Sequence, residues 1–253
     1  MHNLEKRLRN QLQQNSKIKI IDSARWSIPI HSVEVEYKPV KRSKMDILMK
    51  MMLISFQKVE IEGAEQLSEL LLVEQLFVED LISIMKRTGL LEKKGKLFTL
   101  TEKGSEQLKN GVFEEEQETE TQVALYSICH QTFLHGVIKP AMDGEAELET
   151  YRFVKEGYLD EELSFEDEVV IDALQKSAKE TTESDIQTVI SEIQSTTELY
   201  IDDIPCLEFI IYNEEEDALY ARVWNTLLEK WDEQLEHELE EKERITWRKR
   251  YLS

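Results

Sequence analysis

The stretch from Ile61 to Gly104 constrains the fold most, because its helix and strand signals follow one another with almost no spare residues. A short helix is predicted over residues 64–72, where three leucines share one face: Leu67, Leu70 and Leu71. After a turn, a second helix is predicted to end at Thr88. Its apolar residues have the i, i+3, i+4, i+7 spacing of one buried stripe: Val78, Leu81, Ile82 and Met85.

A hairpin and a third helix are predicted directly after Gly89, a residue type that ends many helices. Two strands, one starting at Leu90 and one spanning 97–100, flank a lysine-rich tip, and Thr101 is a suitable N-cap for a helix to Asn110. Helix, turn, helix and two-stranded wing, in this order and at these lengths, resemble a winged helix-turn-helix. The run Leu-Thr-Glu-Lys-Gly at 100–104 is similar to the end of the wing in many bacterial repressors of that superfamily.

The resemblance covers about residues 43–112 and implies a module that binds DNA, RNA or protein. Its first helix is expected to start at Ser43, an N-cap residue type, and to run to about Lys58. Residues 1–42 are expected to form an extended N-terminal arm that begins with a short polar helix. We therefore predict a winged-helix domain near the N-terminus, at 43–112.

Length and composition are those of a folded chain with room for two modest domains, with 253 residues and 41% hydrophobic content. Two cysteines, Cys129 and Cys206, are too few for a disulfide framework and are expected to be reduced, buried thiols. No apolar run approaches the roughly 20 residues of a membrane span. The N-terminal residues lack the apolar core of a signal peptide. We therefore expect a cytoplasmic protein without a membrane span.

The net charge of −21 is unevenly distributed along the chain. Residues 1–110 contain 19 Lys and Arg against 15 Asp and Glu, whereas the remainder contains 12 against 37. A chain this acidic is repelled by the phosphate backbone, which argues against a non-specific DNA-coating protein. The mildly basic N-terminal part could still bind DNA, and the acidic part could bind a basic protein partner.

Basic side chains in the N-terminal half are the candidates for nucleic-acid contact. They lie before and within the first helix of the module, at the end of the helix that ends at Thr88 and on the wing: Lys38, Lys41, Arg42, Lys44, Lys86, Arg87, Lys93, Lys94 and Lys96. They form either a phosphate-contacting patch or an ordinary solvated surface. The wing lysines could follow a phosphate backbone without reading bases.

The outer face of the helix that ends at Thr88 is a poor match for base reading. It carries Glu74, Glu79 and Asp80, whereas base-reading helices usually present Arg, Lys, Asn, Gln or Ser. Phe77 and Ile84 are seven residues apart on one face and are candidates for a protein interface. The alternative is that one or both pack under the N-terminal arm.

The rest of the chain is predicted to be an acidic linker, 113–122, followed by an acidic α+β domain, 123–253. A helix is expected over about 164–179 and another after Ser184. The longest predicted element is an amphipathic helix over about 214–247, with interface candidates on its apolar stripe: Tyr220, Trp224, Leu228 and Trp231. It would either pair with a partner, including a second copy of the chain, or fold back on its own domain.

No sequence motif for catalysis or cofactor binding is present, so we expect no enzyme, no cofactor and no metal. Cys129, His130 and His135 lie close together, but a fourth zinc ligand would have to come from far away in the sequence. Glu147, Glu149 and Lys155 are only loosely similar to a carboxylate nuclease site. The many other carboxylates are expected to be solvated charges.

The sequence thus predicts an α+β, mostly helical fold and a non-enzymatic function. We expect a winged-helix adaptor subunit of a larger bacterial assembly that acts on or near DNA. Winged-helix subunits of bacterial chromosome-organising complexes are similar in charge and module, although no shared motif supports that likeness. The alternatives are a transcriptional regulator that binds DNA through wing and basic arm, and a carboxylate-dependent nuclease.

Overall fold

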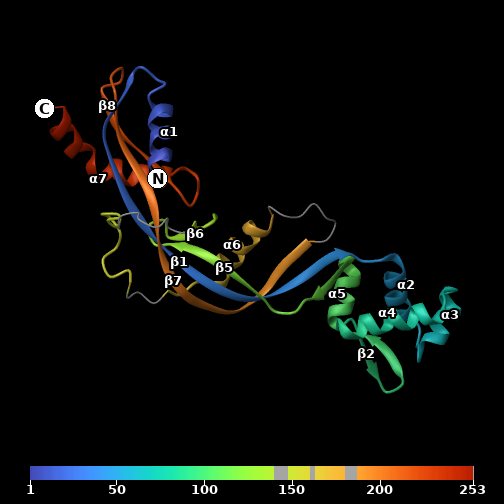
Figure 1. Cartoon of the computed structure of the whole chain (residues 1–253). Coiled ribbons are helices and arrows are strands. Elements are labelled where there is room, and N and C mark those ends of the chain that lie inside the picture. Colours follow the sequence, from blue (N-terminus) through green and yellow to red (C-terminus); the bar gives the residue numbers. More distant parts are fainter. Residues whose placement is uncertain (140–147, 160–162, 180–186, 253) are drawn as a thin grey trace. The chain divides into compact units, whose positions relative to one another are not determined.

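The computed structural model describes residues 1–139, 148–159, 163–179 and 187–252. It is 35% helical and 39% strand, so the prediction of a mostly helical chain is wrong. The strand content comes mainly from a seven-stranded sheet of order β6-β5-β1-β7-β8-β9, with β4 also paired with β1. Two strands, β1 (Ile18–Lys44) and β7 (Gln187–Asn213), are each 27 residues long. Figure 1 shows these two strands side by side.

The chain forms two compact units, and both long strands contribute residues to both of them. Unit 1 comprises Met1–Val35, Gln122–Ser177 and Thr196–Ser253, and unit 2 comprises Glu36–Thr121 and Ala178–Ser195. The shorter strands of the sheet are β4 (Val112–Glu116), β5 (Glu120–Ser127), β6 (Thr132–Leu134), β8 (Ala218–Asn225) and β9 (Lys230–Trp231).

Unit 2 contains the helices and the hairpin predicted for residues 43–110. They are α2 (Ile47–Lys58), α3 (Ala64–Leu71), α4 (Gln75–Arg87), β2 (Leu91–Lys94), β3 (Leu97–Leu100) and α5 (Glu102–Asn110). Their inward side chains form one apolar core, which includes Met52, Leu53, Leu67, Val78, Met85 and Leu90. On α4 three residues of the predicted stripe, Val78, Ile82 and Met85, are buried, whereas on α3 only Leu67 is buried and Leu70 is exposed.

The start of α2 differs from the prediction of Ser43. Ser43 pairs with Phe113 of β4, because β1 continues to Lys44. The N-cap is Asp46, whose carboxylate accepts hydrogen bonds from the backbone N–H groups of Leu48 and Met49, at 2.8 and 3.3 Å.

Two residues of the run at 100–104, Thr101 and Gly104, have specific structural roles. The Thr101 hydroxyl caps α5 by accepting from the Gly104 N–H at 3.0 Å, and it donates to the Gly89 carbonyl at 2.6 Å. A Cβ atom on Gly104 would lie 2.2 Å from the carbonyl oxygen of Leu90. The glycine therefore lets α5 pack directly against the start of the hairpin.

The acidic segment 113–122 is not a linker, because most of it lies in β4 and at the start of β5. Residues 112–116 pair with residues 40–44 of β1, which sets Glu114 opposite Arg42 and Glu115 opposite Lys41. Opposite charges at facing positions stabilise such a pairing. The charge run therefore belongs to the sheet.

In unit 1 the sheet is covered on both faces by helices. On one face α1 (His2–Leu12) packs through Leu8 on Leu207, Phe209 and Ile211 of β7. On the other face α7 (Glu233–Tyr251) packs through Leu235, Leu239 and Trp247. Figure 1 shows α1 and α7 on either side of these strands. The remaining helix, α6 (Asp167–Lys179), agrees with the prediction of a helix over 164–179.

The predicted helix over 214–247 is wrong. Residues 214–217 form a turn, β8 and β9 follow, and α7 begins only at Glu233. The stripe Tyr220, Trp224 and Leu228 has a spacing of four residues, which fits a strand as well as a helix because four is a multiple of two. In β8, Leu219, Ala221 and Val223 are buried and alternate with half-buried residues such as Tyr220 and Trp224, which marks a strand covered on both faces.

A second helix after Ser184 is likewise not observed. Val189, Ile190 and Ile193 lie in β7, and residues 180–186 fall outside the described residues. The helical spacing of Val189, Ile190 and Ile193 does not reflect a buried helical face, because only Ile190 of these three is buried.

Candidate functional site

Several large apolar side chains are exposed at the turn between α3 and α4 in unit 2. Leu72, which adopts a left-handed conformation with φ 56°, is 92% exposed, and Leu76 is 65% exposed. Leu70 and Phe77 are 54% and 53% exposed. The Ser68 hydroxyl donates to the Val73 carbonyl at 2.6 Å and thereby holds the turn. The sequence drew attention to Phe77 but not to the three leucines, because their exposure depends on how the two helices meet.

Ile84 differs from Phe77 in its environment. It is half-buried and packs against the core of unit 2, whereas Phe77 projects into solvent. Of this predicted pair, Phe77 is therefore the residue that offers more apolar surface.

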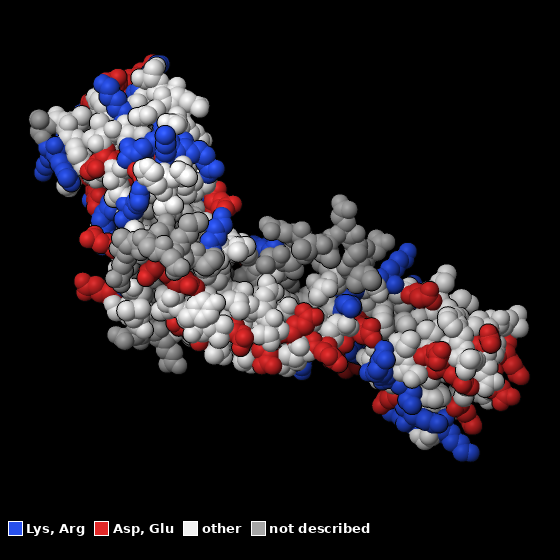
Figure 2. Space-filling view, viewed as in Figure 1, with Lys and Arg blue, Asp and Glu red and all other residues white. Residues whose placement is uncertain are grey.

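Exposed carboxylates lie near these apolar residues in the sequence, and we call them the acidic rim. It consists of exposed carboxylates on α3, on the turn and on α4: Glu65, Glu69, Glu74, Glu79 and Asp80. Within the described residues, none of them forms an ion pair with a lysine or arginine, and Glu79 accepts a hydrogen bond from Gln75 at 2.8 Å. Figure 2 shows acidic atoms around the region of α3 and α4 and basic atoms near the tip of the β2–β3 hairpin. We call the apolar residues Leu70, Leu72, Leu76 and Phe77 with this rim the turn surface.

Four of the nine candidate nucleic-acid contacts, Lys38, Arg42, Arg87 and Lys94, form ion pairs with acidic neighbours. Side chains of β4 bind three cations: Arg42 to Glu114 at 2.6 Å, Arg87 to Glu115 at 2.8 Å and Lys103 to Glu116 at 2.8 Å. The Lys103 contact lowers the pKa of Glu116. The Arg42 pair could not be predicted, because the pairing of 112–116 with β1 joins residues about seventy positions apart, and the other two pairs depend on how α4 and α5 lie beside β4.

The other candidate cations divide into paired and unpaired residues. Lys38 lies 3.6 Å from Glu192, and Lys94 lies 2.7 Å from Glu92. Lys86 and Lys93 lie over the ring of Phe98, at 6.0 and 5.2 Å from its centroid. Three lysines are exposed and have no ion pair with any described residue: Lys41, Lys44 and Lys96.

The interface candidates of the supposed long helix lie in β8 and β9 and in the turn between them. Tyr220, Trp224 and Trp231 are half-buried beneath α1, in the cluster around Leu8. The rings of Trp224 and Trp231 meet edge to face with centroids 5.3 Å apart. Leu228 is also half-buried. The helix of the same chain thus covers most of the surface that was expected to bind a partner.

A Ser–His–Asp arrangement is present in unit 1 and was not predicted. His130 Nδ1 lies 2.7 Å from the Ser127 hydroxyl, and His130 Nε2 lies 3.0 Å from Asp232. Because an ionised carboxylate can only accept, we assign the Nε2 proton to the Asp232 contact, and the serine hydroxyl then donates to Nδ1. The three residues have the types of a hydrolase triad.

The burial of this arrangement favours a structural role. Ser127 is 0% exposed, His130 8% and Asp232 3%, so a substrate carbonyl cannot reach the serine oxygen in this conformation. Asp232 also caps α7 by accepting from the Leu235 N–H, and it accepts from the Asn225 amide at 2.8 Å. Burial acts to raise the pKa of Asp232, but these hydrogen bonds and the one from His130 lower it on balance. The network ties the end of β5 to β8 and α7.

The remaining candidates for chemistry do not form a site within the described residues. Burial, with the charges of Glu238 and Asp232, raises the pKa of the Cys129 thiol to about 12, so this thiol is protonated at neutral pH. No three His, Cys, Asp or Glu side chains in the described parts of the chain are placed to hold a metal ion. Glu147 lies outside the described residues.

A helix that crosses a membrane must meet requirements of both length and hydropathy. None of the helices in the described ranges is both long and apolar enough to cross a bilayer. As for comparisons with known proteins, no family model, no curated protein and no solved structure matches this chain.

Proposed function

We propose that the chain is a non-enzymatic adaptor subunit whose residues 43–112 act as a winged helix that binds a protein. The assembly it serves would act on or near DNA, as the resemblance of this module to bacterial repressors implies. The observation that carries the proposal is the exposed first half of α4, which presents Leu76, Phe77, Glu79 and Asp80 with a single amide side chain, Gln75, whereas the basic residues Lys86 and Arg87 lie only in the last turn.

The turn surface supports a protein partner for two physical reasons. Exposed large apolar residues that lie together gain free energy when a partner removes them from water, at about 25 cal/mol per Å². A rim of unpaired carboxylates repels phosphates and attracts cationic side chains. The complementary partner is a protein segment with an apolar centre and Lys or Arg at its edge, such as a basic amphipathic helix.

Two synthetic helical peptides with the same apolar face would test this proposal, one flanked by lysines and the other by glutamates. We expect the full chain to bind the lysine peptide and not the glutamate peptide. The double variant Leu76→Ser, Phe77→Ser should lose this binding and keep its melting temperature, because both residues are exposed.

Ile47→Ser is the matched control, since Ile47 is 76% exposed on α2 and lies outside the turn surface. Unchanged peptide binding by the Leu76, Phe77 variant, or equal binding of the two peptides, would exclude the turn surface as the docking site.

The second candidate function is a transcriptional regulator that binds DNA through the wing and the basic arm. The exposed Lys41, Lys44 and Lys96 favour it, because they are free of ion pairs with the described residues. A salt titration against a generic duplex tests it: phosphate contact predicts binding at low salt that is lost steeply as salt rises. Absence of binding at low salt leaves the protein-docking function.

A further inference from the structure

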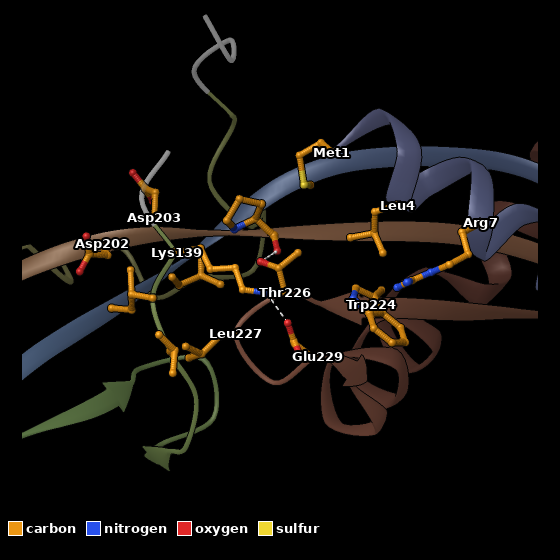
Figure 3. Close-up of a pocket in the computed structure, with 14 residues that line it drawn as sticks. Met1, Leu4, Arg7, Lys139, Asp202, Asp203, Trp224, Thr226, Leu227 and Glu229 are labelled. Carbon is orange, nitrogen blue, oxygen red and sulfur yellow. Dashed lines mark hydrogen bonds and ion pairs between the residues drawn. The ribbon is translucent and has the colours of Figure 1, made fainter. Parts of the chain in front are cut away.

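A cavity of about 720 Å³ lies in unit 1 beside α1, apart from the turn surface and the candidate cations of unit 2. Figure 3 shows that its walls come from α1, from residues 137–139, from β7 at 202–205 and from residues 224–229. Its apolar lining includes Leu4, Ile138, Ile204, Pro205, Trp224 and Leu227. A volume within about 300–1,000 Å³ and a mainly apolar lining with a few charged groups are typical of sites for small organic molecules.

The charged groups of the cavity are unequally neutralised, and two of its three acidic residues, Asp202 and Asp203, are consecutive in β7. Asp202 and Asp203 line one side, away from Arg7 and Trp224 in Figure 3. Asp203 accepts a hydrogen bond from the Ser27 hydroxyl at 3.0 Å. Asp202 has one buried carboxylate oxygen, Oδ2, that has no hydrogen-bond partner among the described residues. Neither aspartate forms an ion pair with a described lysine, arginine or histidine.

The basic groups of the cavity cannot balance these two carboxylates. Lys139 forms an ion pair with Glu229, and Figure 3 shows this contact between the acidic side and Arg7. Arg7 acts on Glu229 as well, since its charge contributes to the lowered pKa of that residue. Burial raises the pKa of Asp202, the nearby Ser32 side chain partly offsets this effect, and the negative charge of Asp203 adds to the increase. The acidic side therefore lacks a cation, while the side of Arg7 does not.

We propose that this cavity binds a small organic monoamine. Its ammonium group lies beside Asp202 and Asp203, and its apolar body packs on Trp224, Leu4 and Leu227. A cation in this position pairs with the exposed Asp203 and with Asp202, which is partly shielded from water, so that the attraction to Asp202 is stronger than in bulk solvent. Arg7 repels a second positive group, which selects against polyamines. The two aspartates repel carboxylate ligands.

Titration of the full chain with octylamine, octanoate and 1-octanol at pH 7 tests the proposal. The three probes share an apolar chain and differ in the charge of the head group. Calorimetry and tryptophan fluorescence report binding, because Trp224 lines the cavity. We expect octylamine to bind at least about tenfold more tightly than either other probe, as the pairing of one partly buried charge requires. The double variant Asp202→Asn, Asp203→Asn should reduce octylamine affinity to that of octanol.

Glu216→Gln is the matched control for the loss of negative charge. Glu216 is exposed in the turn between β7 and β8, at the other end of the ladder that starts at Cys206 and Asn225. It should leave octylamine binding unchanged. If the double variant unfolds, Asp203→Asn alone, which retains an acceptor for Ser27, should still weaken binding several-fold. The proposal is overturned by equal binding of octylamine and octanol, by tighter binding of octanoate, or by no binding of octylamine.

Discussion

Glu208 is a charged residue in the middle of a buried strand. It is 2% exposed in β7, and it accepts from the Trp26 indole at 2.6 Å and from two nitrogens of Arg152 at 2.8 and 3.0 Å. Arg152 also binds Glu243 of α7 at 2.5 and 2.6 Å. A buried carboxylate is tolerated only where such donors replace water. One arginine thus joins the segment after Thr150 and α7 to the sheet.

Removal of this arginine should be strongly destabilising. Arg152→Ala leaves Glu208 buried with one donor, and we expect the free energy of unfolding to fall by about 3–5 kcal/mol. Urea unfolding followed by tryptophan fluorescence reports on unit 1 alone, since all four tryptophans lie there. Lys176→Ala breaks the exposed pair with Asp172 and should cost no more than about 1 kcal/mol. Equal effects of the two substitutions would show that the buried network contributes no more to the free energy of unfolding than an exposed ion pair does.

Asp232 gives unit 1 a defined dependence on pH. Its pKa is lower in the folded chain than the ordinary value of 3.8, so its contribution to stability is fully present above that ordinary value. The contribution is lost as the pH falls through the folded pKa, because the unfolded chain binds the proton first. Asp232→Asn should therefore be less stable than the wild type at pH 7, and this difference should shrink below about pH 4. Urea unfolding at a series of pH values measures it. A difference that stays constant with pH would refute this role.

At the scale of elements, α1 holds the aromatic face of the sheet in unit 1 through Leu8, which is 0% exposed. Leu8→Ala should cost about 3 kcal/mol, as a buried leucine truncated to alanine does. It should also shift the tryptophan emission to longer wavelength, because Trp224 and Trp231 lie in the same cluster. Lys6→Ala, at an exposed position of α1, is the control. An unchanged emission maximum would mean that α1 does not shield these rings.

The elements of unit 2 could be predicted because their signals are local. The stripe of α4 and the cap at Thr101 depend on residues within a few positions of each other. The turn after Asn213 shows where local signals mislead. Asn213 accepts from the Glu215 N–H at 3.1 Å, which is the chemistry of a helix cap, but Asp217 takes a left-handed conformation with φ 48° and the chain returns as β8. Caps and turns use the same residue types.

The sheet could not be predicted from local signals, because its pairings are distant in the sequence. β1 lies beside β7, more than 140 residues later, and no local rule sets that register. The candidate sites also divide into those that local signals located and those that depend on contacts distant in the sequence. The exposed Phe77 lies on a helix that periodicity located, whereas the Ser127–His130–Asp232 network joins residues about a hundred positions apart.

At the scale of the whole molecule, the net charge of −21 does not describe each surface. Acidic residues of β4 are used inside unit 2 to bind Arg42, Arg87 and Lys103. The carboxylates of the turn surface bind no cation within the described residues. The same residue type thus has two roles, one that neutralises basic side chains and one that leaves a free negative surface. These roles can be separated by experiment.

Neutralising the two acidic groups separately should have different effects on DNA binding. The triple variant Glu114→Gln, Glu115→Gln, Glu116→Gln frees three cations. It should bind a generic duplex more tightly at low salt, with a salt slope steeper by up to about 0.9 for each new phosphate contact. Neutralising Glu65, Glu69 and Asp80 changes the net charge equally but frees no cation, so its slope should match the wild type. Equal slopes for the two triples would mean that only net charge matters, because ion pairing in β4 would then not control access of Arg42, Arg87 and Lys103 to phosphate.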